Sequence, residues 1–89
     1  MSVENAFQST SALLRLQVKA EADPGALARV LERFQILNVL PRRVVAEFGA
    51  NDLLYIQIDV VGLEEARLTN IAAKLCQVTT VLGAYWHYV

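Results

Sequence analysis

Hydrophobic and polar residues alternate strictly between Leu14 and Ala20. Every second residue is apolar, and the residues between them are Arg15, Gln17 and Lys19. A period of two with one apolar side is typical of a strand that buries one face. The pattern therefore predicts a first strand here, which ends in a turn at residues 21–23.

A helical period replaces the alternation after Asp23. Apolar residues at i, i+3, i+4 and i+7 predict a helix from Pro24 to about Ile36. Asp23 can cap this helix by accepting a backbone N–H one turn in, and proline suits the first helical position. Asn38 can adopt the left-handed backbone conformation that an exit turn often requires. The apolar side consists of Leu27, Val30, Leu31 and Phe34.

A hairpin follows the first helix. The second strand is expected from about Val39 to Phe48, and Pro41 favours a place at the sheet edge because proline donates no ladder hydrogen bond. Residues 49–52, Gly-Ala-Asn-Asp, predict the hairpin turn. Residues 53–61 alternate more cleanly than any other part of the chain, which predicts a central third strand.

A second helix and a last strand complete the chain. The helix is expected from about Leu63 to Gln77, with a buried stripe of Leu68, Ile71, Ala72 and Leu75. The last strand is expected from Val78 to Tyr88. Gly83 interrupts it and predicts a bulge.

The predicted order is β-α-β-β-α-β, which defines the fold class. We expect an α+β ferredoxin-like sandwich, with one four-stranded antiparallel sheet and two helices on one of its faces. In that plan the first and third strands pair at the centre. Residues 1–11 are small and polar and predict a flexible N-terminal tail, and residues 12–89 predict a single domain.

The composition is unusually apolar for so short a chain. Of 89 residues, 55% are hydrophobic, which predicts an exposed apolar patch or sheet edge that meets a second copy of the chain. The net charge of −1 provides no basic face for nucleic acid. No apolar run reaches the roughly 20 residues of a membrane helix, and no signal peptide is recognisable. With a single cysteine, the sequence favours a soluble protein of the cytoplasm.

Candidate catalytic and metal-binding residues are few. His87 has no Asp or Ser at an instructive spacing, and acid–base catalysis needs a positioned neighbour. Cys76 is expected to pack as a small apolar group on the second helix. Glu64 and Glu65 are adjacent, so on a helix they do not face each other. The sequence predicts no enzyme, no metal site and no cofactor.

Two surface features have alternative interpretations. Arg42 and Arg43 lie on the expected edge strand, where they could contact an anionic ligand or an acidic residue of a partner. We favour the alternative, in which they keep the edge solvated and so discourage aggregation. The outer sheet face could bind RNA by stacking, but stacking needs two or three rings on central strands and only Tyr55 qualifies.

The residues from Asp23 to Leu27 also have two interpretations. Free N–H groups and the positive end of a helix dipole suit a carboxylate, and Gly25 allows close approach because it has no Cβ. Alternatively, these residues are only a well-formed turn between a strand and a helix.

The chain from Leu13 to Val89 resembles the ACT domain family of small regulatory modules. The resemblance rests on the apolar first strand, on residues 23–31, Asp-Pro-Gly-Ala-Leu-Ala-Arg-Val-Leu, and on Asn38-Val39 at the start of the second strand. Within the family, the sequence is similar to the regulatory (small) subunits of acetolactate synthase.

The resemblance implies a homodimer in which edge strands join two sheets. It also implies a small amino acid bound at the dimer interface, between the turn before the first helix and the second strand of the other copy. Backbone N–H groups of residues 25–27 would meet this ligand, and Asn38 would hydrogen-bond to it. The expected ligand site consists of Asp23, Gly25, Ala26, Leu27, Asn38 and Val39.

The functional hypothesis is therefore an allosteric domain. A ligand that prefers one arrangement of the dimer shifts the equilibrium of a partner enzyme by its differential affinity. The resemblance implies a catalytic subunit as partner, acetolactate synthase in branched-chain amino acid biosynthesis being the example. The alternative hypothesis is a dimeric protein-interaction module of the same fold that binds no ligand.

Overall fold

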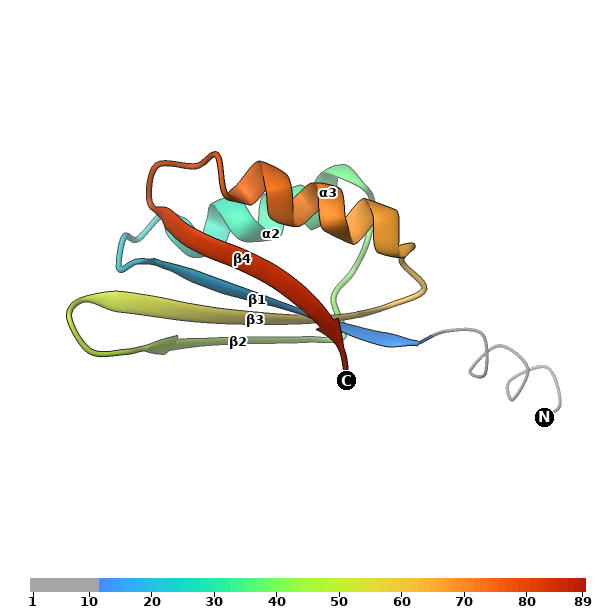
Figure 1. Cartoon of the computed structure of the whole chain (residues 1–89), viewed down its shortest axis with the longest axis horizontal. Coiled ribbons are helices and arrows are strands. Elements are labelled where there is room, and N and C mark those ends of the chain that lie inside the picture. The colour runs from blue at the N-terminus through green and yellow to red at the C-terminus, as the bar shows by residue number, and fades with distance from the viewer. Residues whose placement is uncertain (1–11) are drawn as a thin grey trace, which may run out of the picture.

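Two helices cover one face of a four-stranded antiparallel sheet in the computed structural model, which describes residues 12–89 (Figure 1). The strands lie in the order β2-β3-β1-β4. The predicted ferredoxin-like plan is confirmed, and the predicted tail at residues 1–11 lies outside the described residues. The elements are β1 (Leu13–Glu21), α2 (Ala26–Ile36), β2 (Arg43–Phe48), β3 (Leu53–Val61), α3 (Glu65–Leu75) and β4 (Val81–Tyr88).

The core lies between the helices and the central strands. β1 and β3 pair antiparallel at the centre of the sheet, as predicted, and their register places Leu16 opposite Ile58. The four alternating apolar residues of β1 are at most 2% exposed, and they belong to one buried cluster with Phe34 of α2 and Leu68 of α3. Complete burial of such a side chain contributes about 1.5–3 kcal/mol, so the alternation fixes which face of β1 is inward.

β2 is the edge strand, as predicted, but it begins at Arg43 and not at Val39. Pro41 has no N–H to donate to a ladder, and the chain leaves α2 through a left-handed residue, Asn38. The first hydrogen bond to β3 comes from the Arg42 N–H, which donates to the Asp59 carbonyl at 2.7 Å.

The second half of the chain also departs from the predicted boundaries. α3 is shorter at both ends than the helix expected over residues 63–77. β4 begins at Val81, because residues 78–81 form a turn closed by the Val81 N–H on the Val78 carbonyl at 3.0 Å. Lys19 pairs with Gly83 and Ala20 with Val81, so Leu82 is the extra residue of a bulge beside the predicted Gly83.

Cys76 is exposed, and the expectation that it packs as a small apolar group is wrong. It follows Leu75, the last residue of α3, which is completely buried and takes the inward position. Neither helix within residues 12–89 is long and apolar enough to cross a membrane.

Candidate ligand site

Asp23 accepts hydrogen bonds from two of the backbone N–H groups at the N-terminal end of α2. The Asp23 carboxylate accepts the Gly25 N–H at 3.0 Å, and the Asp23 carbonyl accepts the Ala26 N–H at 2.9 Å. α2 begins at Ala26, so Pro24 lies in the preceding turn, and the Asp23 carboxylate does not accept an N–H from inside the helix as predicted. Two of the three N–H groups expected to meet a ligand therefore have partners within the chain.

Gly25 leaves the Asp23 carboxylate open to approach. The φ of Gly25 is −83°, which any residue can adopt, so the backbone does not require glycine. A Cβ at this position would lie 3.1 Å from Asp23 Oδ2 and 3.8 Å from Arg29 Cζ. The absence of a side chain thus keeps a space over the carboxylate. Arg29 Nη1 lies 3.9 Å from Asp23 Oδ2, and because both side chains are well exposed this ion pair is weak.

Asn38 ends α2 in the predicted left-handed conformation, with φ 58°. Its N–H donates to the Gln35 carbonyl at 2.9 Å, and the Val39 N–H donates to the Phe34 carbonyl at 2.9 Å. These two bonds form a Schellman motif in which Asn38 stands where glycine is usual. Asn38 is exposed beside a hollow of about 380 Å³, whose other lining residues are Leu31, Gln35, Val39, Leu40 and Pro41.

The six predicted site residues form two separate groups. Asp23, Gly25, Ala26 and Leu27 lie at the start of α2, and Asn38 and Val39 follow its end. At 1.5 Å of rise per residue, the 13 steps from residue 25 to residue 38 span about 20 Å. A single amino acid cannot bridge that distance, so one chain alone does not assemble the whole site.

The edge strand β2 exposes an apolar surface beside these two groups. The side of β2 that faces the helix layer continues rows of buried residues from β3, but the helices do not cover it. Phe48 is 82% exposed and Val44 is 41% exposed, and Leu40, just before the strand, is 90% exposed. We call Leu40, Val44, Ala46 and Phe48 the β2 apolar surface. Sequence reasoning predicted such a patch from composition but did not place it.

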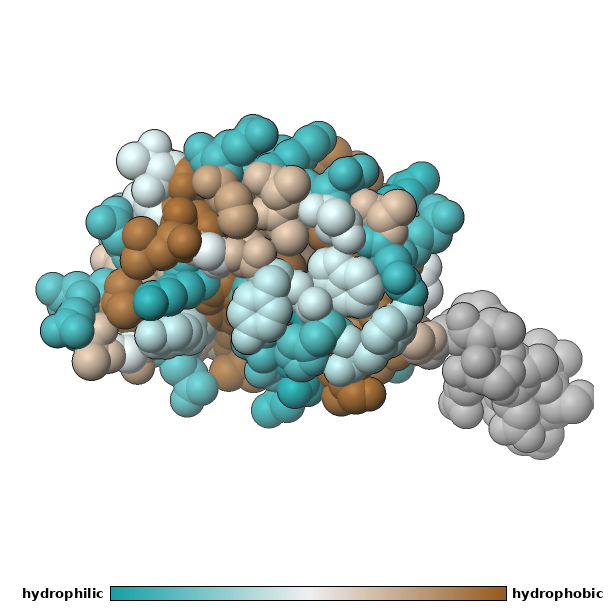
Figure 2. Space-filling view, in the orientation of Figure 1, coloured by the Kyte–Doolittle hydropathy of each residue, from teal (hydrophilic) through white to brown (hydrophobic). Residues whose placement is uncertain are grey.

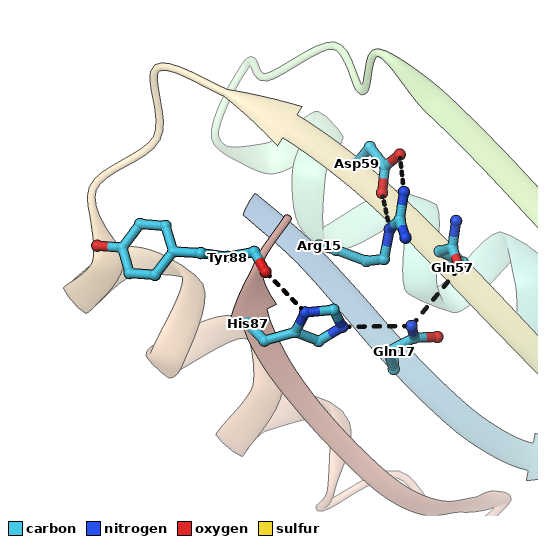
Figure 3. Close-up of polar contacts among 6 residues, drawn as sticks. All are labelled: Arg15, Gln17, Gln57, Asp59, His87 and Tyr88. Atoms are coloured by element: carbon cyan, nitrogen blue, oxygen red, sulfur yellow. Dashed lines mark hydrogen bonds and ion pairs between the residues drawn. The ribbon is translucent and has the colours of Figure 1, made fainter. Parts of the chain in front are cut away.

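A second polar cluster crosses the uncovered face of the sheet (Figure 3). Arg15 donates to both carboxylate oxygens of Asp59, at 2.8 and 3.1 Å. The hydrogen bonds from Arg15 lower the pKa of Asp59, outweighing the burial that raises it, and they raise the pKa of Arg15. Sequence reasoning missed this pair, although both residues occupy outward positions opposite each other on the two central strands.

His87 has hydrogen-bond partners on the same face of the sheet. His87 Nδ1 lies 3.0 Å from the Tyr88 carbonyl, which can only accept, so Nδ1 carries the proton in the neutral ring. Nε2 then accepts from the Gln17 amide at 3.4 Å. The His87 ring also stacks on Tyr85, with ring centroids 6.0 Å apart. Figure 2 shows pale side chains with rings gathered over β4. These contacts give His87 a packing role. Within residues 12–89, no three metal-ligating side chains come together.

Comparisons with known proteins agree with this architecture. Residues 7–89 match the model of a family described as ACT-like domain. No curated protein matches the sequence. The C-terminal domain of the MgtC protein from Mycobacterium tuberculosis superposes with a TM-score of 0.72 at 17% identity, over 88% of this chain and 87% of that one.

Two further solved structures have the same fold. The ACT domain of GTP pyrophosphokinase from Chlorobium tepidum gives a TM-score of 0.71 at 14% identity, over 86% of this chain and 99% of that one. The regulatory subunit of aspartate kinase from Thermus flavus gives 0.67 at 10% identity, over 85% of this chain and 51% of that one. At these identities, the likeness is one of fold.

Proposed function

Because the chain belongs to the ACT-like domain family, we propose that it is a regulatory domain that pairs with a second copy and binds a small amino acid between the two copies. Domains of this family commonly dimerise and regulate partner enzymes. The observation that carries the proposal is the β2 apolar surface, which lies uncovered on an edge strand between the two groups of predicted site residues.

Antiparallel pairing of β2 with β2 of the second copy would cover this surface. It would also satisfy the unpaired backbone groups of the edge, which otherwise invite uncontrolled association. A two-fold axis makes such an interface self-complementary and closed, so assembly stops at the dimer.

The same pairing supplies the missing half of the ligand site. The two-fold axis reverses one copy relative to the other, so the start of α2 in one copy lies toward the end of α2 in the other. Residues 23–27 of one copy and Asn38 of the second copy then flank one small space. This arrangement resolves the separation of about 20 Å within a single chain.

The charges in this space set the orientation of the ligand. The Asp23 carboxylate repels a carboxylate and attracts an ammonium group, so the amino end of the ligand lies at Asp23. The Asn38 side-chain amide of the second copy donates to the carboxylate of the ligand. Leu31, Val39 and Leu40 around the hollow suit an aliphatic side chain. Valine, leucine and isoleucine are therefore the ligands we propose, with the catalytic subunit of acetolactate synthase as the partner enzyme.

Thermal unfolding of the full chain with each of the twenty amino acids tests the proposal. A ligand at 100 times its Kd adds about 2.7 kcal/mol to the stability, which raises the unfolding midpoint. Asn38→Gly retains the left-handed turn but removes the amide, so it should remain dimeric and lose the shift. Asn51→Gly is the matched control, since Asn51 also has a positive φ, 61°, in the β2–β3 turn. If no amino acid moves the midpoint at millimolar concentration, the ligand-binding proposal fails.

A dimeric interaction module without a ligand is the second candidate. The observation that favours it is the pairing of the Gly25 and Ala26 N–H groups with Asp23, which leaves fewer donors for a ligand. A stable dimer whose midpoint no amino acid changes would support this function.

A further inference from the structure

A groove with an apolar floor and a basic rim lies between α2 and α3. Its volume is about 340 Å³, within the range of ligand-binding pockets. Ile71 is buried at its floor, Leu37 is half-buried, and Ile36 is 65% exposed. The remaining lining residues are Arg33, Arg67, Asn70 and Lys74.

The charges around the groove are all positive. Its lining includes no carboxylate, and within residues 12–89 neither Arg33 nor Lys74 forms an ion pair. Arg67 lies 3.4 Å from Glu64, but both side chains are exposed and such a pair is weak. Arg33 is half-buried as a residue and forms no ion pair within residues 12–89, so its charge is not compensated by a carboxylate of the described chain. The groove therefore favours an anionic occupant with an apolar side.

The spacing of the cations favours a polypeptide over a small anion. Arg67 and Lys74 are seven residues apart on α3, which is two helical turns or about 10 Å. Arg33 lies across the groove on α2. One phosphate contacts both cations only if the two long side chains converge on it, whereas an extended occupant meets each of them along the groove. A helix with an apolar stripe flanked by glutamates can place its stripe on the isoleucines and its carboxylates beside the cations.

We propose that this groove is the docking site for an acidic, amphipathic segment of the protein that the domain regulates. The proposal takes the existence of a regulated partner from the proposed function, but it uses a different surface from the β2 apolar surface. Ile36 and Leu37 directly precede Asn38, so a segment in the groove and an amino acid at Asn38 contact the same last turn of α2. That shared turn couples the two binding events.

Binding of a defined peptide to the full chain tests the docking site. The probe is a fluorescein-labelled 14-residue helix with leucines at i, i+3, i+4 and i+7 and glutamates beside them, measured by fluorescence anisotropy. A second peptide with glutamine in place of every glutamate is its control. We expect the acidic peptide to bind at least about tenfold more tightly than the glutamine peptide, with amide NMR shifts concentrated in residues 33–37 and 67–74.

Two matched charge-reversal variants locate the binding. Arg67→Glu with Lys74→Glu should weaken acidic-peptide binding at least about tenfold. Lys19→Glu with Arg42→Glu changes the net charge by the same amount at exposed sites outside the groove. This variant should weaken acidic-peptide binding less than about twofold. All four residues are exposed, so both variants should fold.

Three results would overturn the docking site. One is equal weakening by both variants, another is NMR shifts that map elsewhere, and the third is displacement of the peptide by millimolar inorganic phosphate, which would indicate a small-anion site. The amino-acid thermal shift, measured on the same variants, separates the two proposals. A persistent shift without peptide binding refutes only the groove. Peptide binding without any amino-acid shift refutes only the ligand proposal.

Discussion

The Asp23 carboxylate accepts the Gly25 N–H at 3.0 Å, just before the first residue of α2. A carboxylate of the chain therefore stands where the sequence predicts the carboxylate of a ligand. This relationship fixes the turn between β1 and α2, and it gives the start of the helix a negative charge at close range. In the proposed function, a bound amino acid therefore presents its ammonium group here.

Removing that carboxylate should have separate effects on stability and on binding. Asp23→Ala releases the Gly25 N–H and should lower the free energy of unfolding by about 0.5–1 kcal/mol, the usual worth of one partly exposed hydrogen bond. It should also abolish the thermal shift caused by amino acids, because the ammonium group loses its partner. Glu32→Ala, which removes an exposed carboxylate from α2, is the matched control and should keep the shift. Urea unfolding measures the first effect, and an unchanged stability would mean that the hydrogen bond contributes nothing in solution.

The Arg15–Asp59 pair predicts how stability responds to acid. Arg15 holds the pKa of Asp59 below its value in the unfolded chain, about 3.9. Between those two pKa values the unfolded state binds a proton that the native state does not, so stability rises with pH in that window. The contribution is complete above about pH 4 and is lost as the pH falls through the folded pKa.

Asp59→Asn should therefore lower stability at neutral pH and flatten its dependence on pH below about pH 4. Thermal unfolding midpoints between pH 2 and pH 7 provide the measurement. Asp52→Asn, in the exposed β2–β3 turn, is the control that should retain the wild-type dependence. A slope in Asp59→Asn as steep as that of the wild type would show that other carboxylates dominate the acid response.

The β2 apolar surface should decide the oligomeric state. Phe48→Asp places a charge in the proposed interface, at the end of β2, and should weaken the dimer at least about 100-fold, as measured by sedimentation equilibrium. Because Phe48 is 82% exposed, the monomer should change in stability by no more than about 0.5 kcal/mol. Leu82→Asp alters an apolar residue that is 55% exposed on the other edge strand, and it should leave the dimer intact. Loss of the dimer in Leu82→Asp alone would place the interface on β4.

Periodicity predicted the parts of this fold that burial determines. The alternation in β1 and β3 predicted their inward faces, because a slip of one residue would expose every apolar side chain, and the order of the elements predicted that these two strands pair. The residue at which β2 begins could not be predicted from periodicity. It depends on the direction that the chain takes after Asn38 and on one hydrogen bond from Arg42. Cys76 was placed wrongly because its burial depends on where α3 ends.

The sequence proposes the candidate site as a set of positions, but it does not show how those positions lie relative to one another. A family resemblance brings residues 23–27 and Asn38 into one site, and the length of the helix between them shows that one chain cannot close it. That length can be read from the sequence. The use of the Gly25 and Ala26 N–H groups by Asp23 cannot, because it depends on the path of three residues through the turn.

The left-handed conformation of Asn38 allows its structural and binding roles to be separated. A Cβ at positive φ costs about 1–2 kcal/mol unless the side chain can compensate as asparagine does, so Asn38→Ala should destabilise the protein by about 1 kcal/mol. Asn38→Gly avoids that strain and should be as stable as the wild type or slightly more so. Both variants lack the amide and should lose the amino-acid thermal shift equally. If Asn38→Gly keeps the full shift, the amide does not bind the ligand, and Asn38 serves only to end α2.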